Sequence, residues 1–317
     1  MPNWYVKAAL QGTMSLLPDP QKYNRVFQRF VTGTDDLSVD FFRKKVAAVD
    51  RHLDVWSSLA TEPLPKHIVE LGSGWHPIVP VALLLRGAER VTSLDVQHLT
   101  QTKQVRNVLA CFEREVSENP GRWRSDASEI VARGLASSGE PAELLGAMGI
   151  ELLVADARHT SLAPGTVDFI ISNNTFEHIP APTLSEILHE FRRVLSDDGV
   201  MSHMIDLQDH YAGFDSSITV YNFLAFSERR WKLFNNGLQY QNRLRYSEYV
   251  AMAAAAGWTV AAEDLTSDLS SLASVDVHKS FDRFSQDDLA VHTAWMGFMP
   301  QTRVQPISRP ESQVFVP

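Results

Sequence analysis

The residues of this chain best suited to bind a polar ligand stand at the ends of five short apolar segments. The segments are 67–71, 91–95, 151–155, 167–172 and 200–205, and the polar residues at or just beyond their ends are Glu70, Asp95, Asp156, Asn173 and Asp206. Burial of each segment explains its apolar residues but not the polar side chain that accompanies it. Parallel strands bring their carboxyl ends to one edge of a sheet, where α/β proteins bind ligands. We therefore predict one ligand site built from these five residues.

A glycine-containing turn, Glu70-Leu-Gly-Ser-Gly74, links the first segment to an apolar helical stretch. Glycines let the backbone approach a ligand closely, and the start of a helix presents free N–H groups. Asp95 follows Gly74 by 21 residues, the offset at which a second-strand carboxylate binds ribose hydroxyls. The pattern predicts a nucleoside-containing ligand. A nicotinamide dinucleotide fits less well, because its fingerprint needs a third glycine where this chain has His76 and Pro77; glycines that merely form a turn are the other alternative.

A second polar group, Asn173-Asn-Thr-Phe-Glu-His178, follows the fourth segment. His178 is a candidate general base, because an imidazole with an ordinary pKa of about 6.5 can remove a proton at neutral pH. The alternative is that Glu177 and His178 only shape the turn before Pro180.

A third polar group, which includes Asp209, His210 and Tyr211, follows the fifth segment. We predict that His210 and Tyr211 contact an acceptor substrate and take part in catalysis; a solvated polar loop is the alternative. The stretch that follows, up to Tyr246, is rich in aromatic residues. Such density after the fifth strand suggests a lid around a largely apolar substrate.

The elements that must position these residues alternate between strand and helix. Two further strands are expected at 258–262 and 291–299, so the pattern predicts a doubly wound, mostly parallel seven-stranded α/β sheet. We expect an N-terminal helical cap over 1–60, a ligand-binding domain over 61–300 with the lid insertion at 207–246, and a loose C-terminal tail over 301–317.

Taken together, these motifs resemble those of the class I S-adenosylmethionine (SAM)-dependent methyltransferases. The matching parts are the glycine turn, Asp95, Asp156-Ala157 and residues 168–178, in the family's order, and the resemblance extends over about residues 66–205. It implies a Rossmann-like fold, SAM as the cofactor and an enzyme that transfers a methyl group.

The resemblance also implies a role for each matching residue. Gly72 and Gly74 would pass under the methionine part of SAM, and Asp95 would hold the ribose diol. Asp156 and Ala157 would flank the adenine, with Asn173 beside the methionine or sulfonium. The complete expected cofactor site comprises Glu70, Gly72, Ser73, Gly74, Asp95, Val96, Asp156, Ala157, Asn173 and Asn174.

No metal is expected at this site. Some small-molecule methyltransferases carry Glu-x-x-Glu-His after the fourth strand and bind a divalent metal, but this chain has Asn174 in place of the first Glu. One carboxylate and one imidazole make a sparse metal site without further ligands.

Composition restricts the expected partners and compartment. The chain has 317 residues and a formal net charge of −9, and an acidic surface repels phosphate backbones, so no nucleic acid partner is expected. Cys111 is the single cysteine and cannot form an internal disulfide. The longest apolar run, 78–85, contains Pro80 and is too short to cross a bilayer. We expect a cytoplasmic protein without a membrane partner, and the oligomeric state is left open.

The expected activity is in-line transfer of the SAM methyl group to a small molecule. The sulfonium methyl is already a strong electrophile, so the protein must mainly position a nucleophile and exclude water. Two alternatives are retained. One is cyclisation of SAM's own aminocarboxypropyl chain to azetidine-2-carboxylate with release of methylthioadenosine, and the other is a SAM-fold protein that binds without catalysis.

Overall fold

The computed structural model describes residues 3–15, 17, 37–238 and 240–303. Seven strands form a single sheet in the order β3-β2-β1-β4-β5-β7-β6. Strands β1 to β5 are parallel to one another, whereas β7 is antiparallel to both β5 and β6. The strands span His67–Leu71 (β1), Arg90–Asp95 (β2), Ile150–Val154 (β3), Val167–Asn173 (β4), Leu195–Asp206 (β5), Trp258–Ser267 (β6) and Val291–Pro300 (β7).

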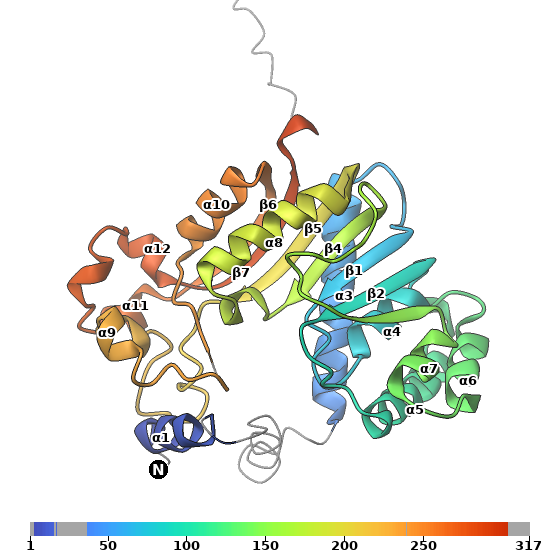
Figure 1. Ribbon diagram of the computed structural model, residues 1–317, viewed down its shortest axis with the longest axis horizontal. Coiled ribbons are helices and arrows are strands. Elements are labelled where there is room, and N and C mark those ends of the chain that lie inside the picture. Colours follow the sequence, from blue (N-terminus) through green and yellow to red (C-terminus); the bar gives the residue numbers. More distant parts are fainter. Residues whose placement is uncertain (1–2, 16, 18–36, 239, 304–317) are drawn as a thin grey trace, which may run out of the picture.

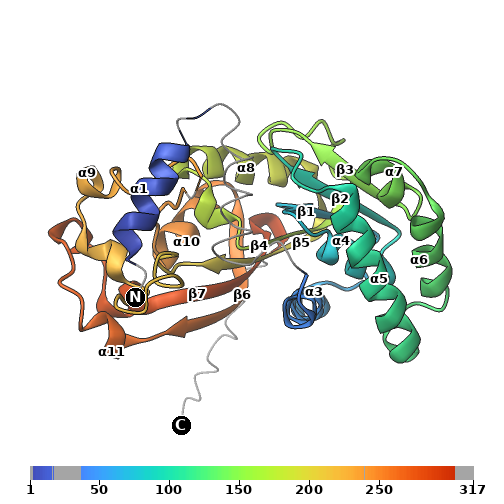
Figure 2. The same ribbon diagram turned by 90° about the horizontal axis from the view of Figure 1, so that it is seen from below.

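Helices cover both faces of this sheet (Figures 1 and 2). Those with apolar residues in the first core are α3 (Val39–Leu59), α4 (Ile78–Leu85), α5 (Thr102–Glu118), α6 (Ala127–Ala136) and α7 (Pro141–Gly146). The opposite face is covered by α8 (Ala181–Val194) and α10 (Tyr246–Ala255). Neighbouring residues of β4 divide between the two sides: Ile171 belongs to the first core and Ile170 to the second, because successive side chains of a strand point to opposite faces.

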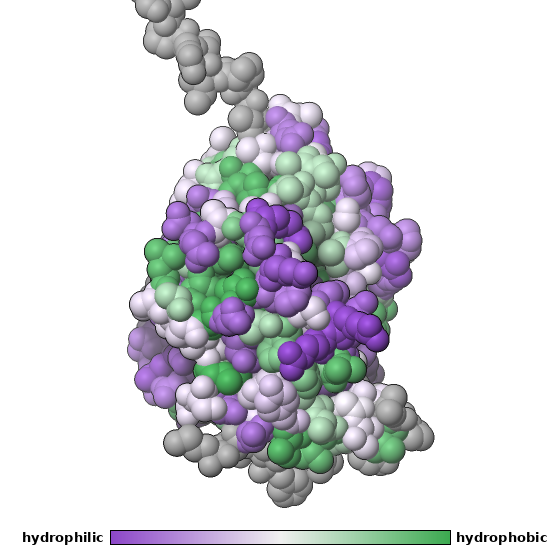
Figure 3. Space-filling model, turned by 90° about the vertical axis from the view of Figure 1, so that its left-hand side faces the viewer, coloured by the Kyte–Doolittle hydropathy of each residue, from purple (hydrophilic) through white to green (hydrophobic). Residues whose placement is uncertain are grey.

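A third core lies at the end of the sheet away from α5, α6 and α7 (Figure 1). It is built around aromatic residues of 211–231, together with Trp4 and Ala8 of α1 (Trp4–Met14). The short helices that adjoin it are α9 (Glu228–Trp231), α11 (Leu269–Leu272), α12 (Gln286–Ala290) and the 3-10 turns η4 (Asn222–Ala225) and η5 (Lys279–Phe281). Figure 3 views this end, where hydrophobic residues are interspersed among hydrophilic ones.

The predicted fold is confirmed: the sheet is doubly wound, mostly parallel and seven-stranded, and an insertion follows the fifth strand. The two later strands are longer than the sequence pattern indicates. Strand β6 continues to Ser267 instead of ending near Ala262. It is an edge strand that pairs only with β7. Its second half is mostly exposed or half-buried, so it lacks the apolar run of a central strand.

The N-terminal helices pack in different places. Helix α3 lies against the sheet and α4, whereas α1 packs on the third core. Both helices fall within the region 1–60 where the sequence predicts a helical cap. Of the expected C-terminal tail, 301–303 form the 3-10 turn η6 (Gln301–Arg303), and 304–317 lie outside the described residues. No helix in the described part of the chain is both long and apolar enough to cross a membrane.

Candidate cofactor and acceptor site

A cavity of about 920 Å³ opens at the carboxyl ends of β1, β2 and β4. Its wall combines the turns after these strands with the start of α3 and the start of α8. The structure places all ten residues of the expected cofactor site on this wall: Glu70, Gly72, Ser73, Gly74, Asp95, Val96, Asp156, Ala157, Asn173 and Asn174. These ten residues come from the ends of four strands, β1 to β4, and meet at one concave surface; Asp206, expected with them at the end of β5, does not line it.

The glycine turn after β1 needs both of its glycines. Gly72 and Gly74 have positive φ angles of 91° and 61°, which side chains other than glycine rarely adopt. A Cβ atom on Gly72 would also lie 2.5 Å from Oγ1 of Thr175. That hydroxyl donates a hydrogen bond to the Leu71 carbonyl at 3.2 Å, so the turns after β1 and β4 are packed directly against each other.

Asp95 fixes the shape of this turn from β2. Its carboxylate accepts hydrogen bonds from the backbone N–H of Gly74 at 3.3 Å and of Gln97 at 3.0 Å. Partial burial raises its pKa, and the backbone hydrogen bonds oppose that rise. Because each carboxylate oxygen has a second lone pair, Asp95 can still accept hydrogen bonds from a ligand in the cavity.

Glu70 lies deeper, with only 3% of its surface exposed. Burial raises its pKa to about 7, although a hydrogen bond from Ser93 Oγ at 2.7 Å and the charge of Lys45 act in the opposite direction. Lys45 comes from α3 and also lines the cavity, and burial lowers its pKa. The cavity wall therefore contains a carboxyl and an amine whose burial disfavours the charged form of each.

Asp156 occupies the opposite, more open side of the cavity. The guanidinium of Arg158 donates to its two oxygens at 2.6–3.0 Å, and the Arg158 backbone N–H donates at 3.0 Å. These hydrogen bonds lower the pKa of Asp156 to about 2. Asp156 is therefore an ionised acceptor held in a fixed position.

Asn173 is oriented by a buried hydrogen-bond chain that reaches back to α3. His52 Nε2 lies 3.1 Å from Asn173 Oδ1, and His52 Nδ1 lies 2.8 Å from Ser202 Oγ. Burial lowers the pKa of His52 to about 3, so the ring is neutral. The amide assignment makes Nε2 the donor to Oδ1, and Asn173 Nδ2 is then buried without a hydrogen-bond partner among the described residues. That N–H group is available to a ligand.

The three residues expected to act in catalysis are not all brought together. His178 lines the cavity, and its ring lies 5.0 Å from that of His210. His210 is outside the cavity wall but next to Asp206, with 3.5 Å between Nε2 and Oδ2. Tyr211 is separate from both: it is 2% exposed in the third core, and its hydroxyl donates to the Phe234 carbonyl at 2.9 Å.

The lid insertion is hydrogen-bonded to the turn that carries His178, the 3-10 turn η3 (Phe176–His178). His178 Nδ1 lies 2.8 Å from the Tyr240 carbonyl. The Asn242 side-chain amide donates at 2.8 Å to the carbonyls of Phe176 and Ile179, and its backbone N–H donates to the Glu177 carbonyl. The insertion thus supports one wall of the cavity.

The sequence predicts a helical cap over 1–60 but not which of its residues line the cavity. Ser38, Phe41 and Lys45 line it, but in the sequence Lys45 resembles a solvent-facing residue of an amphipathic helix. A half-buried lysine one turn after Phe41 is distinguished from an exposed one only by the packing of α3 on the sheet. No pattern within one helix carries that information.

Comparisons with known proteins were made on sequence and on structure. The family profile described as "Methyltransferase domain" matches residues 123–202. No curated protein sequence matches significantly. Solved structures similar to this chain include a protein from Pyrococcus horikoshii OT3, with 13% identity, a TM-score of 0.48 and coverage of 88% of this chain and 98% of that one. Another is geranyl diphosphate methyltransferase in complex with SAM, with 11% identity, a TM-score of 0.44 and coverage of 83% and 91%.

The profile match agrees with the architecture described above. It spans residues on both sides of the β4 turn that contributes Asn173, Asn174 and His178 to the cavity. The doubly wound, mostly parallel seven-stranded sheet is the fold predicted from the sequence. Residues 123–202 of this chain therefore match a methyltransferase domain, and they lie within the doubly wound sheet predicted from the sequence.

Proposed function

We propose that this protein transfers the methyl group of SAM to a small molecule bound in the same cavity. One observation supports this most directly: a single cavity of about 920 Å³ is lined by all ten expected cofactor residues and also by apolar residues of 179–187. Small-molecule sites usually measure about 300–1,000 Å³, so the cavity is large enough for a cofactor and a modest acceptor.

In this proposal the cofactor residues act by position and charge. Asp95 accepts hydrogen bonds from the ribose hydroxyls, and the turn formed by Gly72 and Gly74 lies under the methionine part. Asp156 is an ionised acceptor for the adenine amine, as its hydrogen bonds with Arg158 support. Asn173 Nδ2 donates to an oxygen of the methionine part or of the acceptor, because it has no other partner among the described residues.

The acceptor side is the wall that contains His178 and Ile179. His178 Nδ1 faces a carbonyl, which can only accept, so Nδ1 carries the proton and Nε2 has a free lone pair. Burial lowers the pKa of His178, which keeps the ring neutral. These contacts support a role for His178 toward the acceptor, whereas Tyr211 supports the lid from within the third core.

The test begins with cofactor binding. Calorimetry should show binding of SAM and of S-adenosylhomocysteine, and Asp95→Ala should weaken SAM binding by about 1.5–3 kcal/mol, the scale of hydrogen bonds to a charged group. Asp95→Asn removes the charge but keeps an oxygen that can accept a hydrogen bond from the turn, so it separates the effect of the charge from the effect of the turn's shape. Asp197→Ala, which removes an exposed carboxylate outside the cavity, is the matched control. Unchanged affinity in Asp95→Ala would disprove the ribose assignment.

Product analysis then separates the three activities. S-adenosylhomocysteine formed only with an acceptor supports methyl transfer. Methylthioadenosine formed from SAM alone together with an equal amount of azetidine-2-carboxylate instead identifies cyclisation of the aminocarboxypropyl chain. Tight SAM binding without product over a broad panel of hydroxyl, amine and carbon acceptors favours a binding protein.

A further inference from the structure

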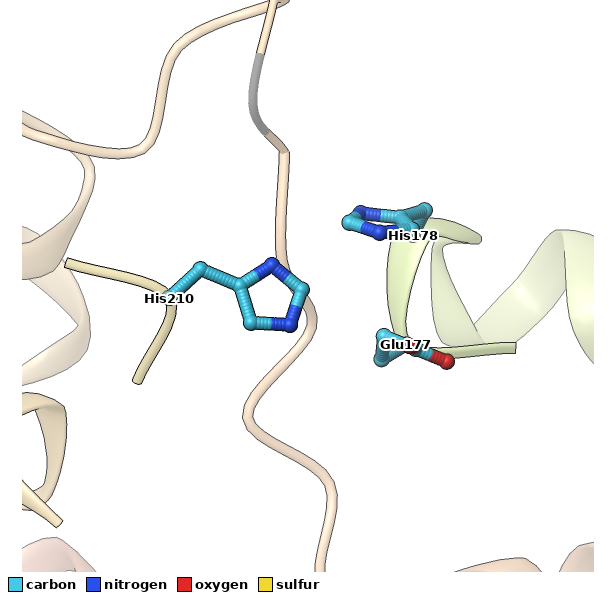
Figure 4. A group of neighbouring side chains, drawn as sticks. All are labelled: Glu177, His178 and His210. Atoms are coloured by element: carbon cyan, nitrogen blue, oxygen red, sulfur yellow. The ribbon is translucent and has the colours of Figure 1, made fainter. Parts of the chain in front are cut away.

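A cluster of three metal-binding residue types lies beside the cavity. Glu177 and His178 come from η3, after β4, and His210 comes from the turn after the neighbouring strand β5. Figure 4 shows His210 on a separate segment facing the turn that carries the other two. One potential ligand atom from each residue lies within 4.8 Å of the other two. The adjacent parallel strands bring these residues together although 32 positions separate the two histidines.

Glu177 is the unusual member of the cluster. It is only 1% exposed, and no side chain among the described residues donates a hydrogen bond to either carboxylate oxygen; only the backbone N–H groups of Glu177 and Asp206 are close enough to oppose the rise of its pKa that burial causes. Two charged groups act on the Glu177 carboxylate. Asp206 disfavours a second negative charge there, whereas the positive charge of Lys45 favours it. A buried carboxylate without a partner is costly, and protein interiors keep such a group protonated or pair it with a cation.

Each histidine keeps one ring nitrogen that forms no hydrogen bond in the described part of the chain. The Tyr240 carbonyl accepts from His178 Nδ1, so the remaining nitrogen, Nε2, is unprotonated. A backbone carbonyl bonded to the far nitrogen is the usual support of a metal-binding histidine. His210 Nε2 is also buried without a hydrogen bond in the described part of the chain, and it lies 3.5 Å from Asp206 Oδ2.

We propose that Glu177, His178 and His210 bind one divalent transition-metal ion, with Asp206 next to it as a further carboxylate. Two imidazoles and a carboxylate suit a borderline ion such as Zn²⁺ or Fe²⁺ better than Mg²⁺ or Ca²⁺, which favour oxygen ligands. The sequence led us to expect no metal because position 174 lacks a carboxylate. The structure supplies a different third ligand, His210, that no local motif reveals.

The ion would lie near the acceptor, because His178 belongs both to the cluster and to the cavity wall. Its open coordination positions would suit an oxygen of the acceptor, such as a hydroxyl or carboxylate. This role in acceptor binding rests on the proposed function, whereas metal binding itself does not.

Metal titration tests the proposal without any measurement of turnover. The untagged full chain is stripped with a chelator and titrated with Co²⁺ by visible absorption and with Zn²⁺ by calorimetry. We expect saturation at one ion per chain. His210→Ala and Glu177→Gln should each weaken binding by more than about tenfold, the least that loss of a supporting residue costs at metal sites. His189→Ala, at an exposed position of α8, should leave binding unchanged.

SAM calorimetry on each variant shows whether the protein is folded. His210→Gln replaces His210→Ala if the latter does not bind SAM. Absence of saturable Co²⁺ binding by SAM-competent protein would overturn the proposal, and so would equal binding in His210→Gln and the unaltered chain. In the first case Glu177 is a buried neutral acid. Neither result affects the proposed methyl transfer, which is tested by product analysis.

Discussion

Glu70 is a buried carboxyl whose pKa depends on folding. Burial removes water from the carboxyl and raises its pKa from an ordinary value of 4.5 to about 7. The folded state therefore binds a proton more readily than the unfolded chain between these two values, and stability falls as pH rises through that range. The free-energy cost of ionising Glu70 in the folded protein is absent below about pH 4.5 and fully present above about pH 7.

We predict that Glu70→Gln stabilises the protein more at pH 8.5 than at pH 5.5. The difference should be on the order of 1–3 kcal/mol, since one pKa unit corresponds to about 1.4 kcal/mol. Glutamine retains an oxygen that can accept the hydrogen bond from Ser93 Oγ. Urea unfolding of the cofactor-free protein at both pH values measures this difference in the free energy of unfolding. Glu113→Gln, at an exposed position of α5, is the control, and an equal gain at both pH values would refute the prediction.

At this scale the sequence identifies residues at strand ends but not residues that meet through tertiary packing. The ten expected cofactor residues reach the cavity because each follows a recognisable buried strand or its turn. Lys45 and the pairing of His178 with His210 depend on how α3 and the β5 turn pack. Tyr211 illustrates the opposite case: adjacency to a strand end placed it near the site in sequence, but its apolar ring is buried in the third core.

At the scale of elements, α3 acts on the site through His52. The prediction is that His52→Leu weakens SAM binding by about 2–12-fold, the equivalent of one ordinary hydrogen bond of 0.5–1.5 kcal/mol. The reason is that Asn173 Oδ1 loses its donor, and the amide is then free to rotate. Calorimetry measures the effect, and urea unfolding shows whether global stability has changed.

His52→Gln is the rescue variant, because its side-chain amide can donate to Asn173 Oδ1. Recovery of affinity in His52→Gln separates a positioning role from a packing role. If His52→Leu binds SAM as tightly as the unaltered protein, then α3 does not set the orientation of Asn173.

The sequence predicts elements where burial is two-sided. Strands β1, β2 and β4 appear as short apolar runs because helices cover both faces. The limits of β6 and the short turn η3 are not visible in this way, since edge strands and single turns have weak patterns. Parts of the site that depend on such elements, including the placement of Glu177, come only from the structure.

At the scale of the molecule, the described residues form three hydrophobic cores, two on the sheet and one shared by the insertion, α1 and 272–290. Trp4 connects α1 to the third: it is 3% exposed, its ring contacts those of Tyr211, Phe226 and Phe234, and its backbone N–H donates to Asp215 Oδ2 at 3.0 Å. The residues of the third core do not line the cavity. We therefore expect the lid to be destabilised separately from the cofactor site.

Trp4→Ala tests this separation. Loss of a buried tryptophan typically costs about 3–5 kcal/mol, so amide hydrogen exchange within 211–234 should accelerate. SAM affinity should change little, while turnover with an acceptor should fall, because a loosened lid excludes water less well. Trp4→Phe, which keeps an aromatic ring, should show smaller effects. A large loss of SAM affinity in Trp4→Ala would contradict the separation of lid and cofactor site.

The order of these parts along the chain has a consequence for how such proteins diversify. Every residue on the cavity wall lies between positions 38 and 187, whereas the lid insertion occupies one continuous stretch, 207–246, between β5 and α10. A single recombination or insertion event can exchange that stretch without altering a residue that lines the cavity. Its descendants would keep the cavity-lining residues and change only His210 and the contacts that support η3, so any new acceptor preference would arise through that wall; grafting 207–246 from one homologue into another is the corresponding route for engineering.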